Sequence, residues 1–286
     1  MSEMENDSEK WDLEIRPKNK WYEIDIKGVW HYRDLILLFV RRDFVSSYKQ
    51  TILGPVWILL QPLISTLMYA FVFGIIAKIP TSGAPPILFY MSAFVPWTFF
   101  ADCTNKTANT FIGNSAIFGK VYFPRLVTPI SNVLSNFMKF LVQIIMFIVI
   151  YVIFLLKGIT VSPNSHVIFI PFLILILGGF GFSFGLIISS MTTKYRDLSF
   201  LVGVGLQILM YSSSVIFSIN IFGNDLKKYF MWNPLLWIME AFRFAFLGVG
   251  TWSWYGLAYS CSFLLVVLVF SVIVFSRVEK TFMDTV

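Results

Sequence analysis

The sequence has few charged residues and almost no cysteine or histidine. Acidic and basic residues make up 13% of the 286 residues and hydrophobic residues 57%, whereas about 25% of a soluble globular domain is charged. Cys103 and Cys261 both lie in apolar stretches, where thiols usually pack as small hydrophobic groups, so no disulfide framework or metal site follows. His31 and His166 lie in predicted water-facing segments at opposite ends of the topology, which argues against a histidine relay. These shortages exclude a soluble enzyme.

Long apolar runs dominate the sequence instead. A helix needs roughly 20 apolar residues to cross about 30 Å of hydrocarbon, and only helices or closed barrels can span a bilayer. The runs are continuous and do not alternate with period two, which favours helices over a barrel. The clear runs are 55–77, 137–156, 167–191, 198–222 and 255–276, with a shorter one at 87–101 that a polar helical continuation could lengthen. We therefore predict an all-α membrane protein with six transmembrane helices.

The placement of charge predicts the orientation of these helices. Of the 38 charged residues (22 basic and 16 acidic), 19 lie in the first 54 positions. If the amino terminus is cytoplasmic, 16 Lys and Arg residues fall in inside segments, five in outside segments, and Lys139 within a span. The positive-inside rule expects this asymmetry, so both termini are predicted to be cytoplasmic.

No basic region precedes an early apolar run, so we expect no cleavable signal peptide. The basic residues form no stripe interleaved with aromatics, so nucleic acid is not an expected partner.

The predicted organisation has four parts. They are a cytoplasmic segment (1–30), an amphipathic interface helix (31–54), a transmembrane domain (55–276) and a cytoplasmic tail (277–286). The interface helix is inferred from apolar residues that recur every four positions beside a basic face. These apolar residues are Ile36, Val40, Phe44 and Tyr48.

Residues 223–250 are apolar enough for a seventh span, but their sequence interrupts a single helix. Asn233-Pro234 breaks the run, and Glu240 and Arg243 lie in its second half. Such segments are tolerated at membrane depth only where protein or a wet cavity covers them. We therefore predict a re-entrant helical hairpin that enters from the outside before the last span.

Several predicted spans carry polar or small residues on one face. The fifth span has Gln207, Tyr211 and Ser214 at steps of four or three, and Tyr69 and Phe73 continue such a row on the first span. Packing between spans and a hydrated path both explain these rows. A further row of small residues in the fourth span allows close helix contact, either within one chain or across a dimer. This row is Gly181, Gly185 and Ser189.

Lys139 is a charged residue inside a predicted span. A charge there costs on the order of 3 kcal/mol on insertion scales, so it should face protein or water and find a partner. Asp102 is predicted to lie at a similar depth, and we expect the two to form an ion pair. Lys106, one helical turn from Asp102, is the competing partner.

No catalytic or nucleotide-binding pattern is present in the sequence. Residues 113–120 read GNSAIFGK, which has one residue too many between its glycines for a phosphate-binding loop and is followed by Val121. We expect no cofactor on this chain. If transport uses ATP, then ATP and Mg must bind to another subunit.

Several segments resemble the membrane subunit of polysaccharide-exporting ABC transporters, the permeases that export lipid-linked O-antigen, teichoic acid or capsule. The strongest similarity is the run RRDFVSSYKQTILGPVWILLQP at 41–62, followed by the loop GKVYFPR at 119–125. Supporting signals are Tyr195-Arg196-Asp197 and Asn233-Pro234. The resemblance extends over nearly the whole chain from about residue 28, and it includes the order of six spans with a hairpin before the last.

The resemblance implies a homodimeric permease in a bacterial inner membrane, bound to two copies of an ATP-binding subunit. It implies contact with that subunit at Asp43, Tyr48, Lys120, Phe123, Arg125, Arg196 and Asp197. It also implies a channel for a long glycan lined by Tyr69, Phe73, Tyr211, Phe217, Trp232 and Trp237, with Gln207 and Ser214 as polar members. Arg41 and Arg42 could bind the diphosphate of a lipid-linked substrate or anionic lipid headgroups. These two readings are equally compatible with the sequence.

Two other classes of function remain as alternatives. A drug or small-lipid exporter would have the same architecture but fewer aromatic residues along its pore. A membrane-embedded transferase would need paired acids or a catalytic histidine at the interface, and that pattern is missing from the sequence.

Overall fold

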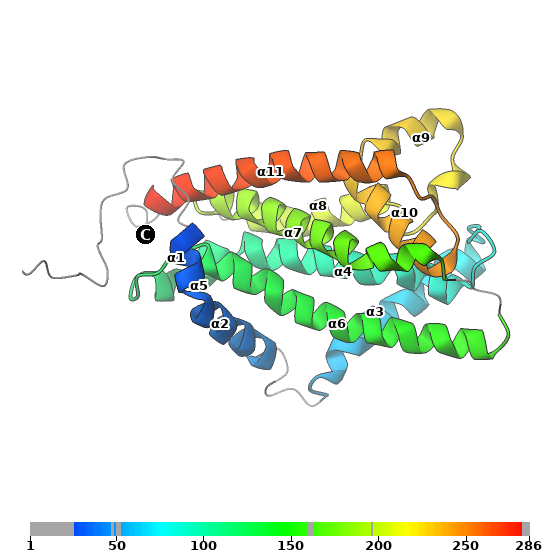
Figure 1. The fold of residues 1–286 in the computed structure, drawn as a ribbon, viewed down its shortest axis with the longest axis horizontal. Helices are drawn as coiled ribbons and strands as arrows, with labels where there is room; N and C mark the ends of the chain where they lie inside the picture. The colour runs from blue at the N-terminus through cyan, green and yellow to red at the C-terminus, as the bar shows by residue number, and fades with distance from the viewer. Residues whose placement is uncertain (1–25, 47–48, 50–52, 160–162, 196, 282–286) are drawn as a thin grey trace, which may run out of the picture.

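A computed structural model describes residues 26–46, 49, 53–159, 163–195 and 197–281, and these form a bundle of helices without a strand in the described part (Figure 1). Five helices in this part are long and apolar enough to cross a membrane. They are Val56–Ile76 (α3, Val56–Tyr69, continued by the π-helical turn Ala70–Ile76), Pro86–Ala108 (α4), Val127–Leu156 (α6), Ser165–Thr192 (a 3₁₀ turn, then α7, Ile170–Thr192) and Trp254–Glu279 within α11 (Trp254–Thr281). The prediction of an all-α membrane protein is confirmed.

The expected fifth span is shorter than the sequence predicted. Its helix, α8, covers Leu198–Ser212 and has 15 residues, whereas the apolar run extends to residue 222. At a rise of 1.5 Å per residue α8 is about 22 Å long, less than the hydrocarbon thickness. The helix ends because Ser214 has a φ of 60°, which a continuing α-helix does not allow.

The centre of the bundle is the contact between α4 and α7. α4 is buried along most of its length. A Cβ atom added at Gly181 would lie 2.5 Å from the Cβ of Cys103, and one at Gly185 would lie 2.4 Å from the Cβ of Thr107. Gly181 and Gly185 of the small-residue row thus serve close packing within one chain, since only glycine leaves room for α4 at these two positions.

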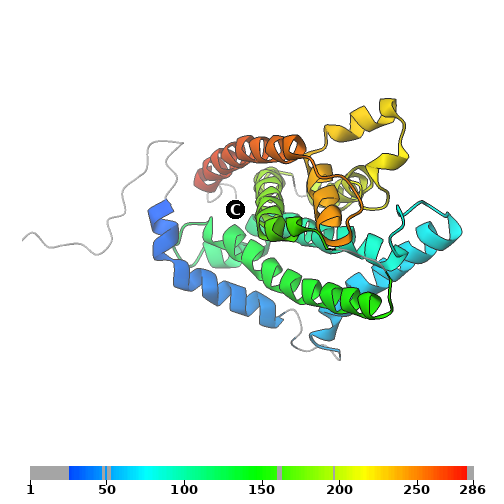
Figure 2. The same cartoon turned by 45° about the vertical axis from the view of Figure 1, so that its right-hand side comes forward.

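One end of the bundle carries α1 (Ile26–His31), α2 (Arg33–Ser46) and α5 (Thr110–Phe118), with the last turns of α11 nearby (Figures 1 and 2). On α2, Ile36 and Phe39 are buried against an apolar cluster from α5, α6, α7 and α11. The predicted amphipathic helix is therefore present, but Phe39 is buried where the four-residue repeat favoured Val40, which is half-buried.

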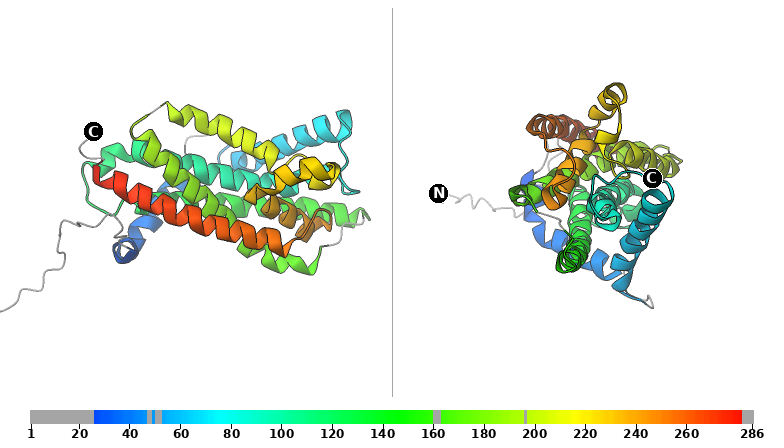
Figure 3. Two further views of the ribbon diagram at one scale, coloured as in Figure 1. Left: turned by 90° about the horizontal axis from the view of Figure 1, so that it is seen from above. Right: turned by 90° about the vertical axis from the view of Figure 1, so that its right-hand side faces the viewer.

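The opposite end carries two short helices, α9 (Asn224–Met231) and α10 (Pro234–Leu247), at the position of the predicted hairpin (Figure 3). The side chain of Asn233 accepts a hydrogen bond from the backbone N–H of Leu235 (3.0 Å), which caps α10. The Asn233 amide also donates to the carbonyl of Ser212 (3.1 Å) and to the hydroxyl of Ser213 (2.9 Å). The break that the Asn-Pro pair predicts is thus tied directly to the end of α8.

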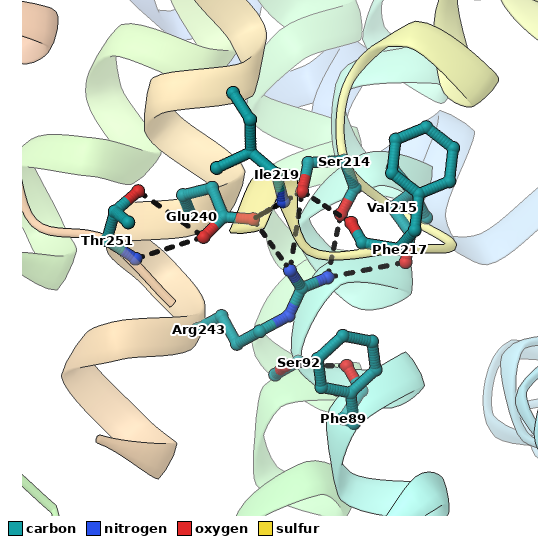
Figure 4. A network of polar contacts seen from close by, with 9 residues as sticks. All are labelled: Phe89, Ser92, Ser214, Val215, Phe217, Ile219, Glu240, Arg243 and Thr251. Atoms are coloured by element: carbon teal, nitrogen blue, oxygen red, sulfur yellow. Dashed lines mark hydrogen bonds and ion pairs between the residues drawn. The ribbon is translucent and has the colours of Figure 1, made fainter. Parts of the chain in front are cut away.

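A buried ion pair on α10 holds the segments around the hairpin together (Figure 4). Nη1 of Arg243 lies 3.1 Å from Oε1 of Glu240, and both side chains are fully buried. A second guanidinium nitrogen, Nη2, donates to the carbonyl of Ser214 (2.7 Å), and the guanidinium lies 4.0 Å from the centre of the Phe89 ring. The Glu240 carboxylate accepts from the backbone N–H groups of Ile219 (3.2 Å) and Thr251 (3.0 Å). The two side chains therefore hydrogen-bond the non-helical backbone before α9 and after α10.

This network corrects two features of the sequence interpretation. Arg243 is one of the five basic residues predicted for outside segments, but it is buried; four remain there, and the asymmetry becomes 16 to 4. Helical spacing predicts Ser214 on the polar face of a longer fifth span, but it lies beyond α8 inside the network. Its hydroxyl lies within hydrogen-bonding distance of the Glu240 carboxylate and of the Phe217 carbonyl, and its single O–H donates to one of them at a time.

Removal of one partner of this pair should destabilise the fold. Arg243→Met leaves a carboxylate buried without its cation, a loss of about 3–5 kcal/mol in the free energy of unfolding. A combined Glu240→Leu and Arg243→Met variant should recover part of this loss, because it buries no unpaired charge. The measurement is the melting temperature of purified protein in detergent, with the exposed Lys228→Met as the control. Equal melting temperatures for Arg243→Met and the unchanged protein would contradict the assigned role.

Candidate functional site

One side of the loop between α5 and α6 packs against neighbouring helices, and the other side is exposed. Phe123 is 5% exposed, and its ring centre lies 5.9 Å from that of Phe39 on α2 and 5.6 Å from that of Phe118 on α5. The backbone N–H of Arg125 donates to the Glu279 carboxylate on α11 (3.1 Å), and the Arg125 guanidinium donates to the Glu279 carbonyl. The loop is therefore fixed to α2, α5 and α11 at once.

Arg125 stays charged in this half-buried position. Burial lowers the pKa of its guanidinium, and the nearby Glu279 carboxylate and Tyr122 phenol oppose that shift. An arginine titrates so far above neutral pH that the net lowering leaves it cationic. The link between the loop and α11 is thus a charge-assisted one at physiological pH.

The exposed side of the same loop carries apolar side chains. Tyr122 is 71% exposed and Val121 57% exposed, while Lys120 is exposed beside them. Tyrosine is enriched at protein interfaces, so this exposed pair on an anchored loop is a candidate protein contact. Among the predicted coupling residues, Lys120 therefore lies on the exposed side of the loop. Phe123 and Arg125 instead connect the loop to neighbouring helices.

The other predicted coupling residues lie in two further places. Asp43 on α2 forms an ion pair with Arg42 (2.9 Å). Asp197 is exposed at the start of α8, on the segment that joins α7 to α8. Tyr48 and Arg196 lie outside the described residues.

A polar cavity of about 440 Å³ lies where α2 meets α4, α5 and α6. Its lining includes Arg42, Asp43, Asn105, Lys106, Asn109 and Asn132. Arg42, which the sequence assigned to a diphosphate or to headgroups, lines this cavity. Its neighbour Arg41 is exposed and is not among the lining residues.

Asp102 and Lys139 lie on two of the same helices: Asp102 is one turn before Lys106 on α4, and Lys139 follows Asn132 on α6. The Asp102 carboxylate interacts electrostatically with both Lys139 on α6 and Lys106 on α4. Asp102 forms no direct ion pair within the part of the chain that the structure describes. The structure therefore brings the predicted pair near one another, with the competing Lys106 beside it.

Three of the predicted channel aromatics come together where α3 and α8 meet. The rings of Tyr69 and Phe73 are stacked with centres 5.8 Å apart, and the Tyr69 hydroxyl lies 3.9 Å from the sulfur of Met210. Tyr211, next to Met210 on α8, lies near Tyr69 and is 44% exposed. Gln207, one turn earlier on α8, is also exposed. These residues form one mixed aromatic and polar surface, named here the α3–α8 surface (Tyr69, Phe73, Gln207 and Tyr211).

The other three aromatics lie in and around the hairpin. Phe217 packs edge-on against Phe222 (4.8 Å between ring centres) and Phe230 (5.6 Å). Trp237 packs so closely on α11 that a Cβ at Gly256 would lie 2.2 Å from its ring, whereas Trp232 is 78% exposed at the turn. The six predicted rings therefore do not share one surface, and Phe217 and Trp237 take part in packing.

The polar cavity was the feature that sequence reasoning missed. Asn105 on α4 and Asn109 at the C-cap of this helix are four residues apart, and this spacing within the polar end of α4 is the available signal. The contribution of α2 to the cavity depends on how α2 docks on α6, which the sequence of neither helix specifies.

Comparisons with known proteins identify the family of this chain. The chain matches the ABC-2 type transporter family over residues 34–247. It is 25% identical over 254 residues to the O-antigen export system permease protein RfbA of Klebsiella pneumoniae, covering 88% of this chain and 94% of that protein. It is 23% identical over 226 residues to RfbA of Myxococcus xanthus (77% and 83% covered) and 21% identical over 210 residues to the polysialic acid transport protein KpsM of Escherichia coli (71% and 77% covered). Since the family match covers well over half of the sequence, the chain belongs to the ABC-2 type transporter family.

Proposed function

We propose that this chain is the membrane subunit of an ATP-driven exporter that moves a lipid-linked polysaccharide from the cytoplasmic to the outer side of a bacterial inner membrane. The observation that carries the proposal is the similarity over most of the chain to permeases named for O-antigen export and polysialic acid transport. The α3–α8 surface supports it, because aromatic rings beside an amide suit the flat faces and hydroxyl groups of sugars.

The proposed assembly is a homodimer bound to two copies of an ATP-binding subunit, which hold ATP and Mg. The coupling face comprises α2, the 119–126 loop and the α7–α8 connection, and it lies on the cytoplasmic side with both termini. Tyr122 and Val121 are its exposed apolar centre. Because the loop is anchored to α2 and α11, a push on it from the ATPase would be transmitted to both helices.

The α3–α8 surface is proposed as one wall of the glycan channel, with the second copy supplying the other wall. A sugar that stacks on a ring keeps most of its contact while it slides, because stacking is less directional than hydrogen bonding. Gln207 offers donors and acceptors for sugar hydroxyls along the same path. The polymer could thus advance from ring to ring without a deep binding site.

Deletion of the gene tests the proposed function in cells. Lipid-linked glycan should accumulate on the cytoplasmic side of the inner membrane, and expression of the intact chain together with its ATPase should restore export. Unchanged surface glycan after deletion would contradict the proposal.

Tyr122→Ala tests the coupling face. The substitution should weaken association with the ATP-binding subunit about tenfold or more, since a buried tyrosine at the centre of an interface is a typical hot spot. The chain itself should remain folded, because Tyr122 is 71% exposed. The measurement is the dissociation constant of the two subunits in detergent. The matched control is Tyr255→Ala, which removes an 84% exposed tyrosine at the opposite end of the bundle; equal affinities for the two variants would exclude this docking face.

Tyr211→Leu tests stacking on the α3–α8 surface. Leucine keeps an apolar side chain but removes the flat ring, so the rate of glycan export should fall severalfold while assembly with the ATPase is unchanged. Tyr211→Phe retains the ring and should export at nearly the original rate. The measurement is surface glycan per cell at matched protein levels. Export that is equally reduced in both variants would point to the hydroxyl and against stacking.

A further inference from the structure

An apolar groove of about 340 Å³ opens where α8 meets α4 and α7. Its lining residues are all apolar except Thr104, whose hydroxyl donates to the Phe100 carbonyl within α4 (2.9 Å). We propose that this α4–α7–α8 groove binds an acyl chain of an anionic membrane phospholipid. The volume lies within the range of about 300–1,000 Å³ for sites of small ligands.

Hydrocarbon is the content that this lining favours. A water molecule in a cavity needs about two to four polar partners, and a single threonine hydroxyl does not supply them. An empty groove would deprive its lining side chains of dispersion contacts. The part of α7 that lines the groove, from Phe184 to Met191, belongs to a helix long and apolar enough to cross a membrane. The surrounding bilayer is therefore the nearest source of apolar groups that can fill the groove.

The groove is elongated and open along one side. Its lining residues on α8 run from Leu198 to Leu209, which corresponds to about 16 Å along a helix. Two of the lining residues are exposed at its rim: Leu201 is 61% exposed and Met191 is 50% exposed. A flexible chain that enters sideways from the bilayer fits this shape better than a compact ligand does.

The groove and the α3–α8 surface occupy opposite faces of α8. Gly205 lines the groove, whereas Gln207 lies about 200° further around the helix, on the same face as Tyr211. The proposed glycan channel and the second copy of the chain are on that opposite face. The groove is thus left to lipid and not to the partner subunit or to the polymer.

A basic residue lies at the end of the groove. The backbone N–H of Lys194 donates to the carbonyl of Met191 (3.2 Å), which places this exposed lysine directly after the rim. The sequence from 193 to 197 has two basic residues, Lys194 and Arg196, and one acidic residue, Asp197. Basic residues next to a membrane span attract anionic lipid headgroups. The chemistry therefore favours a lipid with an apolar chain in the groove and a negative phosphate group at Lys194.

A bound chain would support a helix that has little packing of its own. Only Val202 and Met210 are buried on α8, the short helix that carries Gln207 and Tyr211. An acyl chain between α8, α4 and α7 would add the contacts that these helices do not make with one another. The position of the α3–α8 surface would then depend on an occupied groove.

Photo-crosslinking of the purified permease–ATPase complex in lipid nanodiscs tests this site. The probe is phosphatidylglycerol with a diazirine on one acyl chain, diluted into phosphatidylcholine, and the labelled peptides are identified by mass spectrometry. We expect residues 184–191 on α7 to be labelled severalfold more than the segment around Val149, an exposed apolar position on α6. Labelling no stronger than at Val149 would overturn the proposal.

Gly205→Leu fills the groove and should remove the label. A Cβ atom at Gly205 would meet no atom within 4 Å, so a leucine fits there without a clash and takes the space of the acyl chain. Labelling of the α7 peptide should fall severalfold. The matched control is Gly203→Leu, which also meets nothing within 4 Å but does not line the groove. It should be labelled as the unchanged complex is, and equal labelling of the two variants would exclude the site.

Lys194→Gln tests the headgroup. The preference of the α7 peptide for the phosphatidylglycerol probe over a matching phosphatidylcholine probe should fall about fivefold, because one basic residue near the headgroup is lost. Lys194→Arg keeps the charge and should keep the preference. An unchanged preference in Lys194→Gln would contradict the assignment to an anionic lipid. Gel filtration with the ATPase reports folding of every variant.

Competition identifies the occupant. Excess unlabelled phosphatidylglycerol should reduce the label in the groove, whereas excess farnesyl diphosphate should not. The reverse result would assign the groove to an isoprenoid and overturn the proposal. A second copy of the chain seated in the groove would leave it unlabelled while Val149 is labelled, and would overturn it as well. These outcomes do not depend on whether the chain exports a polysaccharide, so failure of the proposed function would leave this test unaffected.

Discussion

The architecture depends on the need of every backbone N–H and C=O group for a partner where water is absent. Helices meet this need within each span, so the long apolar runs become α3, α4, α6, α7 and α11. The demand is hardest to meet where α8 stops short and the chain turns into α9 and α10. There the Glu240–Arg243 pair and the Asn233 amide hydrogen-bond the non-helical segments from inside the protein. A short span and a broken hairpin are thus possible because buried polar side chains replace the missing helical bonds.

The bundle combines a rigid centre with a less buried side. In α4, 78% of the most apolar 18-residue stretch is buried within the chain. In α3 and its continuation, only 17% of the corresponding stretch is buried. α3 therefore leaves most of its apolar surface for lipid or for another protein. The α3–α8 surface lies on this side, and its Tyr69 also packs on Phe94 of the buried α4, with 5.3 Å between the ring centres. This division suits a subunit whose core keeps its shape while its open side meets a partner and a moving polymer.

The sequence predicts most of the fold because hydrophobic length and helix breaks act locally. Five of the six spans, the amphipathic helix before them and the Asn233-Pro234 break follow from such local signals. The end of α8 does not, because Ser214 takes its backbone conformation inside a network with Arg243 and Glu240, which are far away in sequence. The same limit applies to the candidate sites: a row such as Gln207 and Tyr211 is readable from helical spacing, but the cavity needs four helices to meet. The end of α8 and the polar cavity thus depend on tertiary contacts, which local sequence patterns do not contain.

We propose that the α3–α8 surface faces a water-filled path in the assembled transporter. It is tested most directly by reaction of a cysteine at Gln207 with a membrane-impermeant thiol reagent, in a background where Cys103 and Cys261 are replaced by alanine. Val149→Cys provides the comparison, since Val149 is an exposed apolar position on α6. We predict that Gln207→Cys in the assembled complex reacts readily and that Val149→Cys does not. Protection of both cysteines, or equal labelling of both, would contradict the account.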